Sequence, residues 1–178
     1  MIPYAPRFDR DKVAYFAARY MEIMSAAERL EEEIIVDDVA PRARAAGYFT
    51  KEQFLKVCYW KTPRSRPHCE KNSAEYVREV TRIALSTPNE QLRIEALTLL
   101  QGVGWPTASV FLHFGYADLY PIMDYRALWS LNIEVPPYYD FAFWWSYTEC
   151  CRVLAKDWQV TMRTLDRALW QYSYENQK

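Results

Sequence analysis

Hydrophobic and polar residues alternate along most of the chain with the spacing of amphipathic helices. The first such segment follows Asp9, a residue type favoured at helix N-caps, and its apolar side chains recur at helical intervals: Val13, Phe16, Ala17, Tyr20, Ile23 and Met24. This pattern predicts a helix that continues to about Ile34. The only strand-like run is the short segment 34–36, so the sequence predicts an all-α, compact multi-helix fold.

Capping residues mark where the later helices begin. The segment TKEQ at 50–53 is a capping box, and the helix it opens is expected to stop at a rigid polar loop, 62–67, which contains two prolines. A short helix is predicted over 125–131, and two further helices are predicted over 140–156 and 160–174. The residues predicted to begin helices after residue 50 are Asn72, Thr87, Pro106, Asp124 and Asp140.

The composition supports one globular domain spanning residues 1–178. Apolar residues make up 51% of the 178 residues and aromatic residues 16%, which is typical of a packed core. The chain has four glycines, where average usage would give about 12. Because tight β-hairpins rely on glycine at positive φ, this scarcity disfavours a hairpin-rich β protein.

Several classes of protein are disfavoured by what the sequence lacks. The start of the chain has no apolar core of signal-peptide length, and the longest uncharged stretch, 96–117, is too polar for a membrane span. Four cysteines occur without CxxC spacing, so we expect reduced thiols, a cytoplasmic protein, and neither a metal nor an iron–sulfur cofactor.

Charge is unevenly distributed although the net charge is −1. Residues 42–71 hold eight basic and two acidic side chains, whereas residues 22–38 hold seven acidic and one basic. The basic segment is consistent with an anion-binding face or with an ordinary solvated surface, and both interpretations stay open.

Three of the four glycines fall within the segment 99–115, where one helix ends in Gly-Val-Gly and another begins at once with Pro106. Glycine permits positive φ and a close approach of another backbone. The new helix presents unpaired N–H groups and the positive end of its dipole. Together these features predict an anion site suited to a phosphodiester, which would hold a nucleic acid without reading its sequence.

The same residues resemble a known family. LQGVGWPTAS is similar to the helix-hairpin-helix motif L-x-G-[VI]-G-x-x-T-A of the helix-hairpin-helix-GPD DNA glycosylases, the relatives of endonuclease III and adenine DNA glycosylase. Downstream, YPIMD is similar to the segment that places the catalytic aspartate of that family. The separation of Pro106 from Asp124 equals the family's separation of its lysine from its aspartate.

The resemblance implies a monomer that binds double-stranded DNA, with Asp124 as the catalytic carboxylate. Pro106 occupies the position of the lysine that attacks the sugar in bifunctional members, so Schiff-base lyase chemistry through this position is excluded. The family's iron–sulfur cysteines are also missing. The expected DNA contacts are the hairpin residues Gly102, Val103, Gly104, Trp105 and Thr107 and the basic residues Lys61, Arg64 and Arg66.

Aromatic residues supply a candidate pocket for a flipped base, because stacking between aromatic faces is the usual means of holding one. The candidates are Trp60, Tyr120, Tyr125 and Trp129, and a further aromatic run covers 138–147. Core packing is the alternative for each of them. Other residues also have two interpretations. Asp124 is a good helix cap as well as a candidate carboxylate, and Asp140 is expected to cap its helix but could lie in a pocket beside the aromatic run. His113 is expected to be a packed helical residue, and Lys61 could be a displaced amine nucleophile.

We therefore expect a monofunctional DNA glycosylase of the base-excision-repair type, which hydrolyses the N-glycosidic bond of a damaged or modified base. It would be cytoplasmic and associated with the nucleoid when bound to DNA. The alternative is a non-catalytic helix-hairpin-helix module that binds DNA or another partner, and a third candidate is a helical protein-binding domain.

Overall fold

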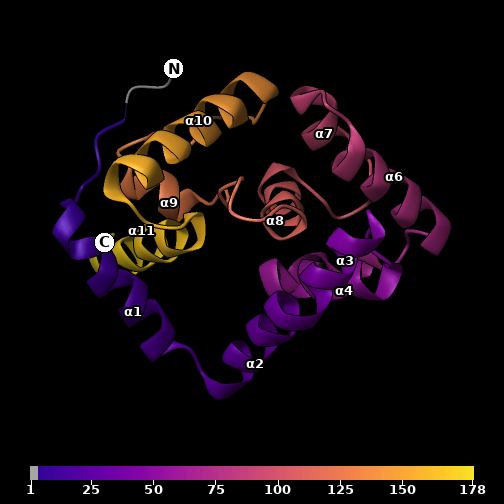
Figure 1. The fold of residues 1–178 in the computed structure, drawn as a ribbon, viewed down its shortest axis with the longest axis horizontal. Helices are drawn as coiled ribbons and strands as arrows, with labels where there is room; N and C mark the ends of the chain where they lie inside the picture. The colour runs from indigo at the N-terminus through magenta and orange to yellow at the C-terminus, as the bar shows by residue number, and fades with distance from the viewer. Residues whose placement is uncertain (1–3) are drawn as a thin grey trace. The chain divides into compact units, whose positions relative to one another are not determined.

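A computed structural model of the protein describes residues 4–178, which form an all-α fold with no strand in that range (Figure 1). The chain divides into two compact units. Unit 1 combines the N-terminal residues up to Met24 with Asp118–Lys178, and unit 2 is the continuous segment Ser25–Ala117. The expectation of a single domain over residues 1–178 stays a prediction.

Unit 1 is built by packing a helix from the start of the chain against helices from its end. α1 lies along α11, and α9 and α10 also contact α11 (Figure 1). The helices of unit 1 are the 3-10 turn η1 (Arg10–Lys12), α1 (Val13–Ile23), α9 (Tyr125–Ser130), α10 (Phe141–Trp158) and α11 (Met162–Asn176).

Aromatic side chains and backbone hydrogen bonds fasten the N-terminal segment to unit 1. The Phe8 ring lies 4.8 Å from the Tyr172 ring and 5.3 Å from the Phe16 ring. The amides of Ala5 and Arg7 donate to the carbonyls of Leu131 and Ser130 at the end of α9. Residues 5–8 are therefore fixed to unit 1, with the Phe8 ring in its core.

Unit 2 is arranged around α8 (Trp105–Gly115), which contacts α3, α4, α6 and α7 (Figure 1). Every residue of α8 from Thr107 to Gly115 is buried, as its almost uninterrupted apolar sequence requires. The remaining helices of this unit are α2 (Ala26–Ile34), η2 (Ile35–Val39), α3 (Ala40–Ala46), α4 (Lys51–Lys61), η3 (Pro63–Ser65), α5 (Arg66–Cys69), α6 (Ala74–Ser86) and α7 (Glu90–Leu97).

The strand-like run near Ile35 is helical. η2 is a π-helical turn between α2 and α3, and Pro41 follows at the start of α3. A proline inside a helix removes a hydrogen bond and its ring crowds the carbonyl four residues earlier. A wide turn directly before Pro41 accommodates that ring without ending the helical segment.

The predicted first helix is too long. η1 and α1 end at Ile23, Met24 is extended, and α2 starts afresh. Ser25 accepts a hydrogen bond from the Glu28 amide while the Glu28 carboxylate accepts from the Ser25 amide, which is a complete capping box. The serine and glutamate three residues apart carried this signal within an otherwise helical pattern.

Other predicted starts are confirmed or shifted by one or two residues. The Thr50–Gln53 capping box, the Asp124 and Asp140 caps and the end of α8 at Gly115 are as predicted, and α8 starts at Trp105, one residue before Pro106. α6 is capped by Ser73 and α7 by Asn89, in place of Asn72 and Thr87. The predicted rigid loop 62–67 is instead two short helical pieces, η3 and the start of α5.

Candidate functional site

The first helix of the hairpin in unit 2 ends earlier than its sequence predicts. α7 ends at Leu97, a series of turns follows, and α8 begins at Trp105. Gly102 adopts φ +83°, in the left-handed region that favours glycine. Gly104 is extended and precedes α8 as its N-cap, with its carbonyl accepting from the Ala108 amide at 2.8 Å.

The start of α8 is not closed by a side chain. Seven of the α-helices between residues 4 and 178, namely α2, α4, α6, α7, α9, α10 and α11, begin after an extended residue whose side chain accepts a backbone N–H. Gly104 has no side chain to do so. Because Pro106 has no N–H, the first turn of α8 has the Trp105 and Thr107 amides as donors, and no N-cap side chain accepts from them at this positive end of the helix dipole.

The two hairpin glycines, Gly102 and Gly104, have different surroundings. A Cβ atom on Gly102 would lie 2.6 Å from Cys69 Sγ and 3.2 Å from His68 Cβ, so this space is occupied by the chain itself. Around Gly104 the nearest such atom is Pro106 Cδ at 3.9 Å, and the residue is exposed. Cys69 therefore occupies the Cβ side of Gly102, whereas the Cβ side of Gly104 is open, and the predicted approach of phosphate to both glycines stays a prediction.

Most other hairpin candidates offer backbone rather than side chain. Val103 and Thr107 are buried, with 6% and 5% of their surface exposed. Trp105 and Pro106 are half-buried. The Ser109 hydroxyl donates to the Pro106 carbonyl at 2.7 Å, which fixes the first turn of α8. Any contact from this turn to a ligand is therefore chiefly a backbone contact.

The basic candidates differ in how far their charge is already engaged. Arg66 Nε donates to Glu70 Oε1 at 3.0 Å, and its guanidinium lies over the Tyr59 ring at 4.6 Å. Hydrogen bonds from Arg66 and, next, from Tyr59 hold the pKa of Glu70 below its ordinary value. Arg64, in η3, is exposed, and Lys61 is the half-buried last residue of α4.

Asp124 lies in unit 1 and caps α9. Its Oδ1 accepts from the Arg126 amide at 3.0 Å, and the residue is half-buried. The hairpin belongs to unit 2, so the expectation that Asp124 and the hairpin form one site stays a prediction. The two readings of Asp124 drawn from its sequence, cap and functional carboxylate, are compatible with this position.

Hydrogen bonds to both backbone groups of Ile122 hold the extended segment before Asp124 in place. The Ile122 amide donates to the Asp166 carboxylate, at 3.1 Å to Oδ1, and the Ile122 carbonyl accepts from the Tyr147 hydroxyl at 2.9 Å. Asp166 and Tyr147 are buried. Burial, followed by the nearby Cys151 and Asp166, raises the pKa of Tyr147, so this hydroxyl keeps its proton and remains a donor. The backbone two residues before Asp124 is thereby fixed.

A tyrosine that was not singled out individually in the sequence lies close to Asp124. Burial raises the pKa of Tyr139, and the negative charge of Asp124 raises it further. Tyr139 also makes an edge contact with Phe143, with ring centroids 5.7 Å apart. Its signal in the sequence was the aromatic run 138–147, which leads into α10.

The candidate pocket aromatics are not equivalent. Tyr120 is buried and stacks on Trp144 with ring centroids 6.0 Å apart, so it is a core residue, the alternative that the sequence left open. Trp129 is half-buried under the Arg7 guanidinium, whose carbon lies 4.5 Å from the ring centroid. Tyr125 is 49% exposed. Trp60 belongs to unit 2, where it packs edge-on against Phe114.

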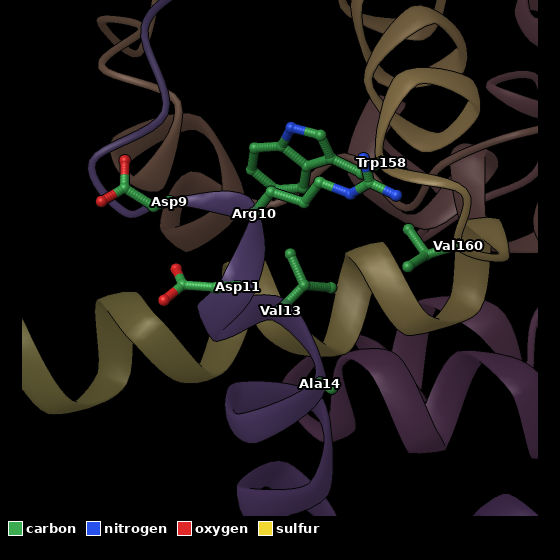
Figure 2. Close-up of a pocket in the computed structure, with 7 residues that line it drawn as sticks. All are labelled: Asp9, Arg10, Asp11, Val13, Ala14, Trp158 and Val160. Atoms are coloured by element: carbon green, nitrogen blue, oxygen red, sulfur yellow. The ribbon is translucent and has the colours of Figure 1, made fainter.

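A shallow pocket occurs in unit 1 between the start of α1 and the end of α10 (Figure 2). Figure 2 shows the Trp158 indole beside the extended Arg10 side chain, with two carboxylates on the η1 side. None of the predicted site residues lines it. The lining residues are Asp9, Arg10, Asp11, Val13, Ala14, Trp158 and Val160.

The structure of residues 4–178 bears on the state of the cysteines, on metal binding and on membrane-spanning helices. Cys58, Cys69, Cys150 and Cys151 are all buried free thiols. Across these residues no group of three or more His, Cys, Asp or Glu side chains is arranged to hold a metal ion. Over the same range, no helix combines the length and apolar character needed to cross a membrane.

No protein-family model and no curated protein matches the chain. A solved structure, the 8-oxoguanine glycosylase/lyase of Methanocaldococcus jannaschii in complex with a 15mer DNA containing 8-oxoguanine, is similar to it with 19% sequence identity. The match covers 94% of this chain and 90% of that chain, with a TM-score of 0.45. Similarity at this level does not assign the chain to a family.

Proposed function

We propose that this protein binds double-stranded DNA through the hairpin formed by α7 and α8, and hydrolyses the N-glycosidic bond of a damaged or modified base with Asp124 as the essential carboxylate. The observation that carries the proposal is the open start of α8. Gly104 is exposed, provides no side-chain cap and leaves room for a close approach.

A phosphodiester fits this start of α8 for two reasons. The uncapped N–H groups are directional donors, and the helix dipole favours a negative charge at the same place. Because the contact uses backbone, it would fix the position of the protein on DNA without reading the base sequence. Exposed Arg64, from the same unit, is available for a second phosphate.

The catalytic part of the proposal rests on Asp124 and on the resemblance of its surrounding sequence to the glycosylases. In the hydrolysis the bond between C1′ and the base nitrogen breaks, and the oxygen of water forms a new bond to C1′. The departing base takes up one proton and the water gives up one. A carboxylate assists by stabilising positive charge on the sugar or by accepting the proton of water. Pro106 has no amine, so a Schiff base at this position does not enter the mechanism.

The experiment is a binding and base-release assay with duplexes that carry alkylated, oxidised or mismatched bases. We expect salt-sensitive binding to duplex DNA, abasic sites with at least one substrate, and no covalent adduct on borohydride trapping. A panel in which binding occurs but no abasic site forms would refute the enzyme assignment for those lesions. A trapped adduct would contradict the exclusion of lyase chemistry and direct attention to Lys61.

A second candidate function is a DNA-binding module without catalysis. It is favoured by the fact that Asp124 already accepts a hydrogen bond from its own helix, which is a complete structural reason for an aspartate there. This candidate predicts the same salt-sensitive binding and no base release from any duplex.

A further inference from the structure

Asn72, between α5 and α6, uses its whole side chain to grip the backbone of the hairpin. Its Oδ1 accepts from the backbone N–H of Gln101 at 2.9 Å, and its Nδ2 donates to the backbone carbonyl of Gln101 at 2.9 Å. The same Nδ2 donates to the Cys69 carbonyl, also at 2.9 Å. Asn72 is 3% exposed, so its own side chain is shielded from water, and its bonds to Gln101 lie at the edge of the packed interior.

Gly102, the residue after Gln101, packs against Cys69 as well. Gly102 has its left-handed φ, and a Cβ on it would collide with Cys69. Asn72 therefore binds both sides of the contact, the hairpin through Gln101 and the end of α5 through Cys69. The turn directly before Gly104 is held against a segment about 30 residues away in the chain.

This grip has a physical requirement behind it. Gln101 lies in the turn after α7, where its backbone groups have no helical partner, and such groups are satisfied by side chains or water. The amide of an asparagine supplies one acceptor and two donors in a fixed plane. It therefore satisfies a backbone N–H and C=O together and restricts the orientation of the peptide that follows.

We propose that Asn72 is the positioning residue of the DNA-binding hairpin: by clasping Gln101 it holds Gly102 and Gly104 in the conformation that presents the open start of α8 to a phosphate. The inference rests on the proposed DNA binding. It adds the residue that makes the hairpin competent, and this residue touches no ligand itself.

The test is Asn72→Asp, which keeps the shape and the acceptor but loses the donor when ionised. At pH 8 we expect duplex binding to weaken about tenfold, the effect of losing one to two hydrogen bonds in a buried site. An aspartate buried here retains its proton to higher pH than the ordinary value of about 3.9. The protonated form again has a donor, so the deficit relative to the wild type should shrink toward pH 5.

The pH series must be read against the wild type, because other groups of the same turn also titrate or carry charge. They are His68, Cys69, Glu70 and Lys71, with Lys51, whose Nζ donates to the Glu70 carbonyl. Residues 99–104 of the hairpin contain no titratable side chain. The quantity to follow is therefore the ratio of the variant and wild-type dissociation constants at each pH.

The four glycines provide a direct readout of the hairpin. A glycine-selective ¹⁵N label gives one backbone amide signal each for Gly47, Gly102, Gly104 and Gly115. Asn72→Asp should shift the signals of Gly102 and Gly104 at pH 8 and leave Gly47 and Gly115 close to their wild-type positions. Four signals at random-coil positions would mean that the variant is unfolded.

Thr81 offers a matched control in the same unit. Its buried hydroxyl accepts from the Phe49 amide at 3.0 Å and donates to the Val77 carbonyl at 2.8 Å, so it also connects to a residue distant in the chain. Thr81→Val should shift the signal of Gly47, which lies close to Phe49 in the chain, and should leave the hairpin glycines and DNA affinity unchanged.

Each outcome decides the proposal. Equal DNA affinity in wild type and Asn72→Asp, with unmoved Gly102 and Gly104 signals, overturns it. If the variant does not fold, hydrogen exchange of the Gln101 amide in the wild type decides: slow exchange supports the clasp, and exchange at the rate of a free amide overturns it. A wild type that binds no duplex refutes the proposed function, even where the glycine shifts show that the clasp exists.

Discussion

α8 and α9 both begin at residues that the sequence marked as functional, yet their first turns are built in opposite ways. α8 follows Gly104, which has no side chain to cap it. α9 follows Asp124, whose carboxylate accepts the Arg126 N–H in the first turn of α9. An open helix start attracts a negative group from outside, while a capped start already carries its own negative charge. The comparison separates a place suited to binding an anion from a place suited to presenting a carboxylate.

The largest expected effect comes from replacing the carboxylate while keeping the cap. Asparagine caps helices as well as aspartate does, so Asp124→Asn should change the free energy of unfolding by less than about 0.5 kcal/mol. Base release should fall by about 10²- to 10⁴-fold, the range typical of a lost acid–base group. Rates of abasic-site formation and thermal melts measure the two quantities.

Asp140→Asn is the control for Asp124→Asn, because Asp140 Oδ1 also accepts an amide hydrogen bond at the start of a helix, from Phe143. It should leave both stability and base release unchanged. Undiminished base release in Asp124→Asn would show that Asp124 takes no part in catalysis. The starts of α8 and α9 would then differ only in how they are capped.

The second prediction converts the open start of α8 into a closed one. Gly104→Asp would add a capping carboxylate where there is room for it, so the protein should become slightly more stable, by a few tenths of a kcal/mol. The added negative charge should repel phosphate and weaken duplex binding by about tenfold or more.

Gly104→Ser provides the neutral comparison, since serine caps the helix without adding charge. Its affinity should lie between those of the wild type and Gly104→Asp. Isothermal or fluorescence titrations with one duplex at fixed salt give the ranking. Unchanged affinity in both variants would mean that this helix start does not meet the DNA.

The third prediction concerns charges near the hairpin within unit 2. Arg66 is engaged by Glu70 and Tyr59, while Arg64 is exposed. If Arg64 contacts a phosphate, Arg64→Gln should reduce the slope of log affinity against log salt by about 1. Arg66→Gln should change the slope less. The opposite order would show that the pair with Glu70 opens on binding.

The smallest effect tests the surroundings of Asp124. Its negative charge contributes, after burial, to the raised pKa of Tyr139, so Asp124→Asn should lower that pKa while leaving it above the ordinary value. A raised tyrosine pKa means that the folded state holds the proton more tightly. The resulting stability is present below the unfolded pKa of about 10 and declines as pH rises through the folded pKa. A ¹³C titration of the Tyr139 ring would detect the change, and an unaltered pKa would place Asp124 away from it.

Local signals predicted the parts of the fold that depend on a few adjacent residues. Thr50 with Gln53 and Asp124 before α9 are caps in the structure as in the sequence. Two cap positions were misassigned where neighbouring residues compete for the role. Asn72 is a good cap by type, but Gln101 recruits its side chain and Ser73 caps instead. A contact between residues so far apart in the chain leaves no trace in helical periodicity.

The candidate site was predictable to the same extent. The left-handed turn at Gly102 and the helix start beside Pro106 follow from local φ preferences, whereas the end of α7 at Leu97 was not predicted. The occupation of the Gly102 space by Cys69 and the burial of Tyr120 depend on tertiary packing, and no local pattern distinguishes a core tyrosine from a pocket tyrosine.

The way α1 and α11 are paired sets an order of events during synthesis. α1 leaves the ribosome well before α11, the helix on which it packs. Unit 2 is continuous in the chain and is complete while α11 has still to be translated. Nascent chains generally fold unit by unit as they emerge, so the Phe16 ring lacks its Tyr172 neighbour until α11 has been translated.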